Sequence, residues 1–125
     1  MPHRRSPLRL DEKRSALMVI DLQEKICPVI PEASEIEREI IRLTDATAVL
    51  SIPATATVQY PRGLGGLVPS LQSVFPTPEE KVDFSAAVCR QALDAWLKDG
   101  RDQIVICGIE THICILQTVL DLLAE

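Results

Sequence analysis

The segment QIVICGIETHIC, residues 103–114, decides the fold of this chain. Residues 103–109 form a short apolar run rich in β-branched side chains, which is typical of a strand buried in a sheet. A polar stretch, ETH, follows at once, and apolar residues then recur at helical spacing towards residue 125. The segment therefore predicts a buried strand that leads directly into a helix beginning near Thr111.

Three other segments predict strands of the same kind. Residues 16–21 (ALMVID) are a continuous apolar run that ends in an acid, and residues 53–59 (PATATVQ) are rich in β-branched side chains after an initial proline. Residues 81–84 predict a short strand. Residues 60–80 hold three glycines and four prolines, and so predict an irregular loop with one helical turn near residues 68–74.

Two further helices are predicted between these strands. Ser34 and Glu37 form a capping box at the start of the first helix, and apolar residues repeat at helical spacing from there to Leu50. Ser85 is the predicted cap of the second helix, which Gly100 ends. Strands that alternate with helices predict an α/β domain whose parallel sheet is covered by helices on its faces.

Length and composition limit the partners and the location that we expect. The 125 residues suffice for one domain, which we expect over residues 15–125 after a disordered tail over residues 1–14. A formal net charge of -5 argues against nucleic acid as a partner, since phosphate binding needs a concentrated basic face. No apolar run is long enough to cross a membrane, and no signal peptide is recognisable. We therefore expect a cytoplasmic protein whose four cysteines are reduced.

Three chemically competent side chains follow predicted strands. Ligands of parallel sheets bind beyond the carboxyl ends of the strands, where Asp21, Lys81 and Cys114 all fall. Cys114 lies in the first turn of a helix, a position that lowers the pKa of a thiol. Asp21 is a candidate general base, and Lys81 is a cation that offsets developing negative charge. Each also has a structural interpretation: Cys114 as a small buried hydrophobe, Asp21 as a turn cap and Lys81 as a solvated charge. The catalytic interpretation therefore rests on all three lying at one edge of the sheet.

Four segments of the chain resemble a known family. The segments LMVIDLQ (17–23), EKVDFSA (80–86) and VICGIETHIC (105–114) resemble the three motif regions of the isochorismatase-like cysteine hydrolases. The stretch TVQYPRGLG (57–65) resembles the second-strand loop of one subgroup, the isochorismatase domain-containing proteins. The resemblance covers about residues 15–125 and implies the three-layer α/β/α, Rossmann-like fold of the isochorismatase-like hydrolases.

The resemblance also implies a role for each matching residue. Asp21 matches the catalytic aspartate of the family, Lys81 its lysine and Cys114 its nucleophile. The cis peptide bond of the family would fall at Ile109–Glu110, and the backbone N–H groups of Glu110 and Cys114 would form an oxyanion hole. The implied reaction is the hydrolysis of a small amide-like or ester-like substrate through a thioester on the cysteine.

Four residues that flank the predicted strand ends are candidates for a substrate pocket, and no metal site is predicted there. Tyr60, Arg62, Phe84 and His112 are the predicted pocket residues, and Arg62 is equally interpretable as a carboxylate ligand or a solvated charge. The nicotinamidases of this superfamily carry an Asp–x–His metal motif, whereas the chain has histidine only at positions 3 and 112. No spacing fits a zinc site, so we expect no metal and no cofactor, and this counts against nicotinamide as substrate.

The C-terminal end departs from the family pattern. Family members continue past the nucleophile's helix with two more strand–helix units, and this chain stops at Glu125. We expect those units to be lacking and the strand over residues 103–109 to have an unpaired apolar edge, which favours pairing with another chain. Two interpretations stay open: a cysteine hydrolase, and a non-catalytic or truncated member that acts through protein association. A homo-oligomer is expected, whereas a thiol redox role is weaker because Cys114 has no resolving cysteine nearby.

Overall fold

A four-stranded parallel sheet forms the centre of the computed structural model, which describes all of residues 1–125. The strand order is β3-β2-β1-β4. β1 (Ser15–Ile20) lies inside the sheet and pairs with β2 (Ala54–Gln59) and with β4 (Gln103–Gly108). β3 (Glu79–Lys81) pairs with the outer side of β2. The carboxyl ends of all the strands therefore lie at one edge of the sheet.

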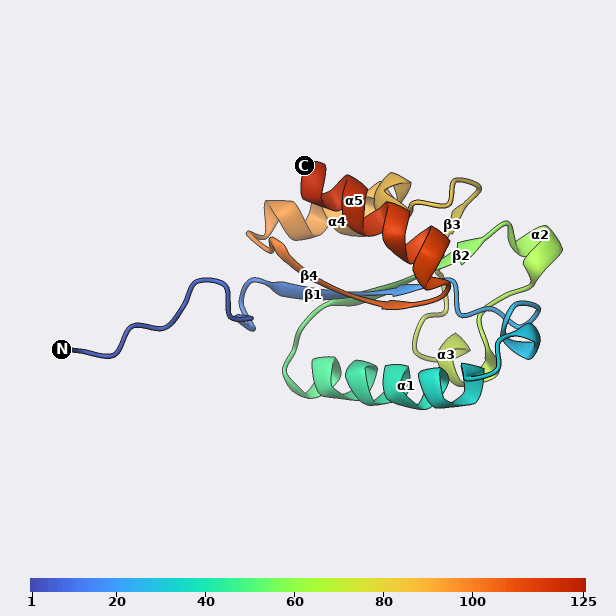
Figure 1. The fold of residues 1–125 in the computed structure, drawn as a ribbon, viewed down its shortest axis with the longest axis horizontal. Coiled ribbons are helices and arrows are strands. Elements are labelled where there is room, and N and C mark those ends of the chain that lie inside the picture. The colour runs from blue at the N-terminus through green and yellow to red at the C-terminus, as the bar shows by residue number, and fades with distance from the viewer.

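Helices cover both faces of this sheet, as Figure 1 shows. α1 (Ala33–Val49) and the short α3 (Pro69–Gln72) lie on one face, and α4 (Arg90–Lys98) and α5 (Leu116–Ala124) lie on the other. The predicted three-layer α/β/α arrangement is therefore confirmed. None of these helices has both the length and the apolar character needed to span a bilayer.

The core consists of two apolar clusters, one on each face of β1. Every residue of β1 is buried, and its side chains point alternately to the two faces. One cluster includes Leu17 and Val19 and packs under α1, whereas the other includes Met18 and packs against Trp96 of α4. Because both faces of β1 are covered, its sequence is a continuous apolar run instead of an alternating one.

The start of α1 differs from the prediction. α1 begins at Ala33, and no side chain caps it, so the capping box of Ser34 and Glu37 is wrong. The first free N–H groups are satisfied locally instead, since the Ala33 N–H donates to the Ile30 carbonyl at 3.1 Å. A side-chain cap is therefore not needed to satisfy them.

Three other boundaries also shift. β3 ends at Lys81 although residues 81–84 were predicted as a strand, because the carbonyls that follow turn inward to the Lys81 ammonium. Ser85 caps a short 3-10 turn, Ala86–Val88, ahead of α4, and Gly100 at φ 77° follows the end of α4 as predicted. The last helix begins with a π-helical turn, Thr111–Ile115, and only then continues as α5.

The predicted unpaired edge is present along β4. β4 has β1 as its single neighbour, and all six of its residues are half-buried. The N-terminal residues 1–10 are exposed, and the N-terminus lies away from the domain (Figure 1). Arg14, which precedes β1, is tied to the start of β4 by a 2.8 Å ion pair with Asp102.

A glycine at the end of β4 provides a test of this strand pairing. Gly108 lies beside Ile20 at φ 125°, and a Cβ atom there would overlap the Ile20 carbonyl oxygen. We expect Gly108→Ala to lower the free energy of unfolding by more than about 1 kcal/mol, since both the conformation and the contact exclude a side chain. Gly66→Ala is the matched control, because no atom lies within 4 Å of its added Cβ. Equal urea midpoints for the two variants would contradict this account.

Candidate active site

The three predicted catalytic side chains meet at the carboxyl edge of the sheet. Asp21 directly follows β1, Lys81 ends β3, and Cys114 lies in the π-helical turn after β4. The Lys81 ammonium lies 2.7 Å from Asp21 Oδ2, and both side chains are almost completely buried. The Cys114 thiol lies close enough to Asp21 and Lys81 for both charges to shift its pKa. Lys81 and Cys114, which follow Asp21 in the sequence by 60 and 93 positions, therefore converge on its carboxylate.

Asp21 is held in an uncommon conformation by the neighbouring strand. Its backbone is left-handed, at φ 55°, which aspartate tolerates better than most residues. Its N–H donates to the Thr57 carbonyl at 3.1 Å, and its Oδ1 accepts from the Thr57 hydroxyl at 2.8 Å. With Lys81 on Oδ2, both carboxylate oxygens have a donor.

The buried Lys81 ammonium is surrounded by oxygen acceptors. Besides Asp21, it donates to Gln59 Oε1 at 2.6 Å, to the Phe84 carbonyl at 2.8 Å and to the Asp83 carbonyl at 3.2 Å. Burying an ammonium costs several kcal/mol, and only a complete set of acceptors together with a counter-charge offsets this cost. Every buried polar side-chain atom of the protein has a hydrogen-bond partner.

Two glutamines complete the network, and sequence reasoning did not identify either as part of the site. Gln59 Nε2 donates to the Val82 carbonyl at 2.7 Å, so its amide bridges Lys81 and the loop after β3. Gln23 Oε1 accepts from the Gln59 N–H at 2.7 Å, and Gln23 Nε2 donates to the Gln59 carbonyl at 2.9 Å. The available signal was that Gln59 ends a predicted strand and Gln23 lies two residues after Asp21.

The pKa of Cys114 moves opposite to the expectation from its place near a helix start. Burial is the largest cause that raises this pKa, followed by the hydrogen bond and the negative charge of Asp21, and the result is about 11. Lys81 and a hydrogen bond from the Glu110 backbone act in the lowering direction. The predicted lowering is therefore wrong, because burial and a carboxylate outweigh the helix start. Cys114 is a protonated thiol at neutral pH and needs a base to become a nucleophile.

The other cysteines are partly or fully buried as well. Burial raises the pKa of Cys89 to about 11 and that of Cys107 to about 12. Cys107 lies on β4, and its thiol faces the Met18 carbonyl at 3.9 Å. Cys114 is distinguished by its position at the carboxyl edge of the sheet beside Asp21 and Lys81, and not by its pKa.

The backbone around Cys114 is tightly constrained. The peptide bond between Ile109 and Glu110 is cis. The Thr118 hydroxyl donates to the Cys114 carbonyl at 2.6 Å and accepts from the Ala86 N–H at 2.7 Å, so it ties the nucleophile's turn to the segment after β3. Whether the N–H groups of Glu110 and Cys114 serve as an oxyanion hole stays a prediction.

Two of the four predicted pocket residues share a pocket. Tyr60 and Arg62 line a cavity of about 560 Å³ over the carboxyl ends of β2 and β3, together with Pro61, Glu80, Lys81, Val82, Asp83 and Val88. Phe84 is not among its lining residues, because its carbonyl turns to Lys81 while its ring is half-exposed. His112 is exposed and lies 3.4 Å from a Glu110 carboxylate oxygen instead.

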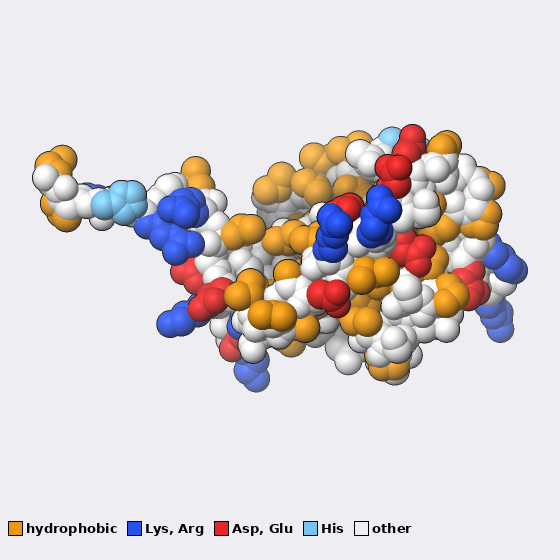
Figure 2. All heavy atoms as spheres, turned by 90° about the horizontal axis from the view of Figure 1, so that it is seen from below, with side chains coloured by type: hydrophobic (Ala, Val, Ile, Leu, Met, Phe, Trp, Pro, Cys, Tyr) orange, Lys and Arg blue, Asp and Glu red, His pale blue; other side chains and the backbone are white.

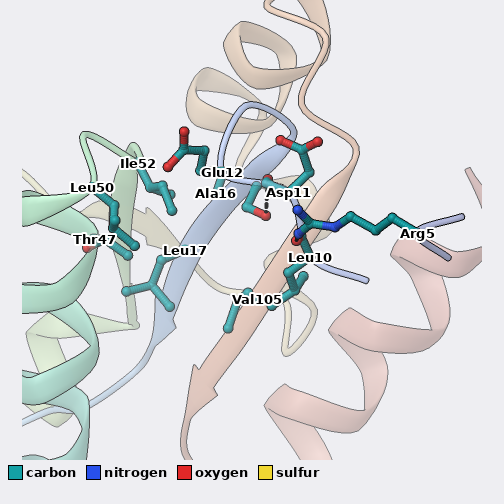
Figure 3. Close-up of a pocket in the computed structure, with 11 residues that line it drawn as sticks. Arg5, Leu10, Asp11, Glu12, Ala16, Leu17, Thr47, Leu50, Ile52 and Val105 are labelled. Carbon is teal, nitrogen blue, oxygen red and sulfur yellow. Dashed lines mark hydrogen bonds between the residues drawn. The ribbon is translucent and has the colours of Figure 1, made fainter. Parts of the chain in front are cut away.

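A second pocket lies at the opposite edge of the sheet. Figure 3 shows this cavity of about 540 Å³, whose walls come from the amino ends of β1 and β4, the end of α1 and the N-terminal segment. Aliphatic side chains such as Leu17, Leu50 and Val105 form much of its lining. It holds none of the three converging side chains. No group of three histidine, cysteine or acidic side chains is placed to hold a metal ion.

Comparison with known proteins agrees with this geometry. The chain is 38% identical over 117 residues to isochorismatase domain-containing protein 2 of Danio rerio, covering 92% of this chain and 58% of that protein. It is 41% identical over 118 residues to protein 2A of Mus musculus, covering 92% of this chain and 55% of that protein. The chain therefore spans just over half the length of these curated relatives.

Solved structures show the same fold. The structure of MAR1 ribonuclease from Caenorhabditis elegans superposes with a TM-score of 0.82 at 42% identity, covering 93% of this chain and 60% of that one. An octameric hydrolase of unknown specificity, the YcaC gene product of Escherichia coli, superposes with a TM-score of 0.81 at 23% identity. The match covers 98% of this chain and 63% of that one. The sequence model of the isochorismatase domain family matches residues 15–125 of this chain. The chain belongs to the isochorismatase domain family.

Proposed function

We propose that the protein is a cysteine hydrolase that acts on a small amide-like or ester-like substrate through a thioester on Cys114. The observation that carries this proposal is the buried Lys81–Asp21 ion pair of 2.7 Å beside the Cys114 thiol. A buried ion pair contributes little to stability, so packing and stability alone do not explain why this edge of the sheet holds one. Similarity to hydrolases supports the reaction class, while the activity of this chain and its substrate belong to the proposal.

The first half of the reaction forms the thioester. Asp21 takes the thiol proton as the Cys114 sulfur attacks the substrate carbonyl carbon, and the carbonyl electron pair moves onto oxygen. The N–H groups of Glu110 and Cys114 hold the resulting oxyanion. When the oxyanion collapses, the bond to the leaving amine or alcohol breaks, and Asp21 returns the proton to that leaving group.

The second half releases the product. Water takes the place of the leaving group, and Asp21 removes a proton from it as its oxygen attacks the thioester carbon. The carbon–sulfur bond then breaks, a carboxylic acid leaves, and the proton returns to sulfur. Lys81 stays charged throughout, orients the carboxylate and offsets negative charge that develops beside it.

Tyr60 and Arg62 are proposed to bind the part of the substrate that does not react. Both line the pocket over β2 and β3, and Arg62 forms no ion pair within the chain. Its guanidinium is therefore free to bind a substrate carboxylate with two parallel hydrogen bonds. Because Phe84 and His112 lie outside this pocket, they receive no role here.

We propose a small molecule and not RNA as substrate, although three similar structures are named as a ribonuclease or a putative ribonuclease. The net charge is -5, and RNA binding depends on a concentrated basic surface. On the α1 face, Arg42 lies 3.1 Å from Glu39, and Figure 2 shows basic and acidic side chains intermixed there. We also place the protein in the cytoplasm, because its four cysteines are free thiols, the state that a reducing compartment maintains.

An acyl-enzyme provides the direct test of this proposal. We expect p-nitrophenyl acetate to release a burst of nitrophenol and to leave one acetyl group on Cys114, detected by mass spectrometry of the digested protein. Cys114→Ala should abolish the burst, whereas Cys27→Ala, which alters a half-buried cysteine outside the site, should retain it. Acetylation spread over several residues, or a burst that survives Cys114→Ala, would remove the basis for the thioester.

The thiol pKa should respond to the two charged partners in opposite directions. Asp21 raises the pKa of Cys114 and Lys81 lowers it, so Asp21→Asn should lower it from about 11 and Lys81→Met should raise it. Because the thiolate is the species that reacts, Asp21→Asn should speed the alkylation of Cys114 below that pKa and Lys81→Met should slow it. The alkylation rate measured against pH gives the pKa of Cys114 in each variant, after circular dichroism has verified that the variant is folded. If the two substitutions shift this pKa in the same direction, the roles assigned to Asp21 and Lys81 are contradicted.

Association through β4 is the second candidate function. β4 has an unpaired edge, it carries no charged residue, and Leu116, Leu120 and Leu123 of the adjacent α5 are exposed. Exposed strand edges without charge promote pairing with another chain. The octameric state named for the Escherichia coli protein, which shares the fold, is compatible with a homo-oligomer.

Light scattering during gel filtration tests this association. We expect a mass above that of one 13.8 kDa chain, and Leu123→Lys, at an exposed position of α5 beside Ile104 and Ile106 of β4, should shift the protein towards the monomer by placing a charge at that edge. Val49→Lys, at an exposed position of α1, is the matched control. If both variants keep the mass of the parent, β4 is not the contact.

A further inference from the structure

Thr57 is a buried polar residue that the proposed mechanism leaves without a role. It lies on β2 beside Ile20 of β1 and is completely buried. Valine has nearly the same shape and favours strands as strongly, so packing alone does not explain a hydroxyl at this position. A buried hydroxyl without a partner costs free energy, so the explanation lies in the bond that it makes.

That bond goes to the proposed catalytic base. The Thr57 hydroxyl donates to Asp21 Oδ1 at 2.8 Å, and the Thr57 carbonyl accepts the Asp21 N–H at 3.1 Å. Thr57 thus contacts both the carboxylate and the main chain of Asp21, whose backbone is left-handed. The hydroxyl donates to no other group of the chain.

The bond also changes how the carboxylate charge is distributed. Asp21 is faced by Lys81 from β3, by the Cys114 thiol from the π-helical turn and by Cys89 from the segment before α4. Lys81 donates to Oδ2 and Thr57 to Oδ1, so each oxygen has one donor and retains one lone pair. A donor on a carboxylate takes up part of its negative charge, which weakens the effect of that charge on a neighbouring thiol.

We propose that Thr57 is a positioning residue for Asp21: its hydroxyl orients the carboxylate so that its free lone pairs face Cys114, and it shares the negative charge. This inference rests on the proposed function, because it assigns Asp21 as the base of Cys114. It adds a residue of β2 to a site that otherwise draws its reacting groups from the ends of β1, β3 and β4.

The test is the rate of Cys114 alkylation by iodoacetamide in the full chain at about pH 9, where the thiolate fraction limits the rate. Thr57→Val removes the donor and leaves more charge on Asp21, so the rate should fall about threefold to tenfold, equivalent to about half to one pH unit. Thr57→Ser restores the donor and should restore the rate. Thr55→Val is the matched control, since Thr55 lies on the same strand and makes no side-chain hydrogen bond. Thr57→Ala is a second variant without the hydroxyl, with the same expected loss.

A double-mutant comparison separates positioning from general support of the fold. In the Asp21→Asn background, Thr57→Val should leave the alkylation rate unchanged, because Thr57 acts through the carboxylate. If Thr57→Val slows alkylation equally in the parent and in the Asp21→Asn variant, the inference is overturned. If Asp21→Asn accelerates alkylation and Thr57→Val has no effect in the parent, the inference alone fails. If Asp21→Asn itself changes nothing, the proposed function fails and this inference with it.

Discussion

The buried ion pair between Lys81 and Asp21 is the interaction on which the rest of the site depends. Neither charge contacts solvent, so the attraction across 2.7 Å must be supplemented by hydrogen bonds that replace water. This requirement explains the arrangement around the pair. Gln59 and two backbone carbonyls take up the ammonium, and Thr57 takes up the second carboxylate oxygen. The strand β3 stops at Lys81 for the same reason, since the carbonyls that follow serve the ammonium instead of the sheet.

Burial and the same pair together set the protonation state of Cys114. A cysteine near a helix start is expected to be acidic, yet burial and the neighbouring carboxylate raise the pKa of this thiol to about 11. The group is therefore stored as a neutral thiol, which avoids burying another charge beside Asp21. The carboxylate that is proposed to accept its proton lies beside it, so activation coincides with attack on a substrate. A thiol in this state should react slowly with general alkylating reagents and faster with substrates that the pocket orients.

The sheet links the two proposed roles of the chain. β1 is covered on both faces and paired on both edges, which places Asp21 rigidly at the centre of the carboxyl end. β4 positions Cys114 from one side while its other edge has no partner. A partner that pairs with this edge would contact the strand that carries the nucleophile's turn. The proposed association and the proposed catalysis would therefore both depend on β4, even though they rest on different observations.

The sequence by itself determined the alternation of strands and helices, the buried nature of β1 and the position of Asp21, Lys81 and Cys114 at one edge of the sheet. These depend on apolar runs and on positions directly after them, which are local properties of the chain. The tertiary structure alone decided the hydrogen bonds of Thr57, Gln59 and Gln23, which join residues 22 to 42 positions apart. It also placed Phe84 and His112 outside the pocket, replaced the predicted cap of α1 and reversed the expected pKa shift of Cys114. Each of these outcomes depends on side-chain direction and desolvation, and both are defined only once distant segments have packed together.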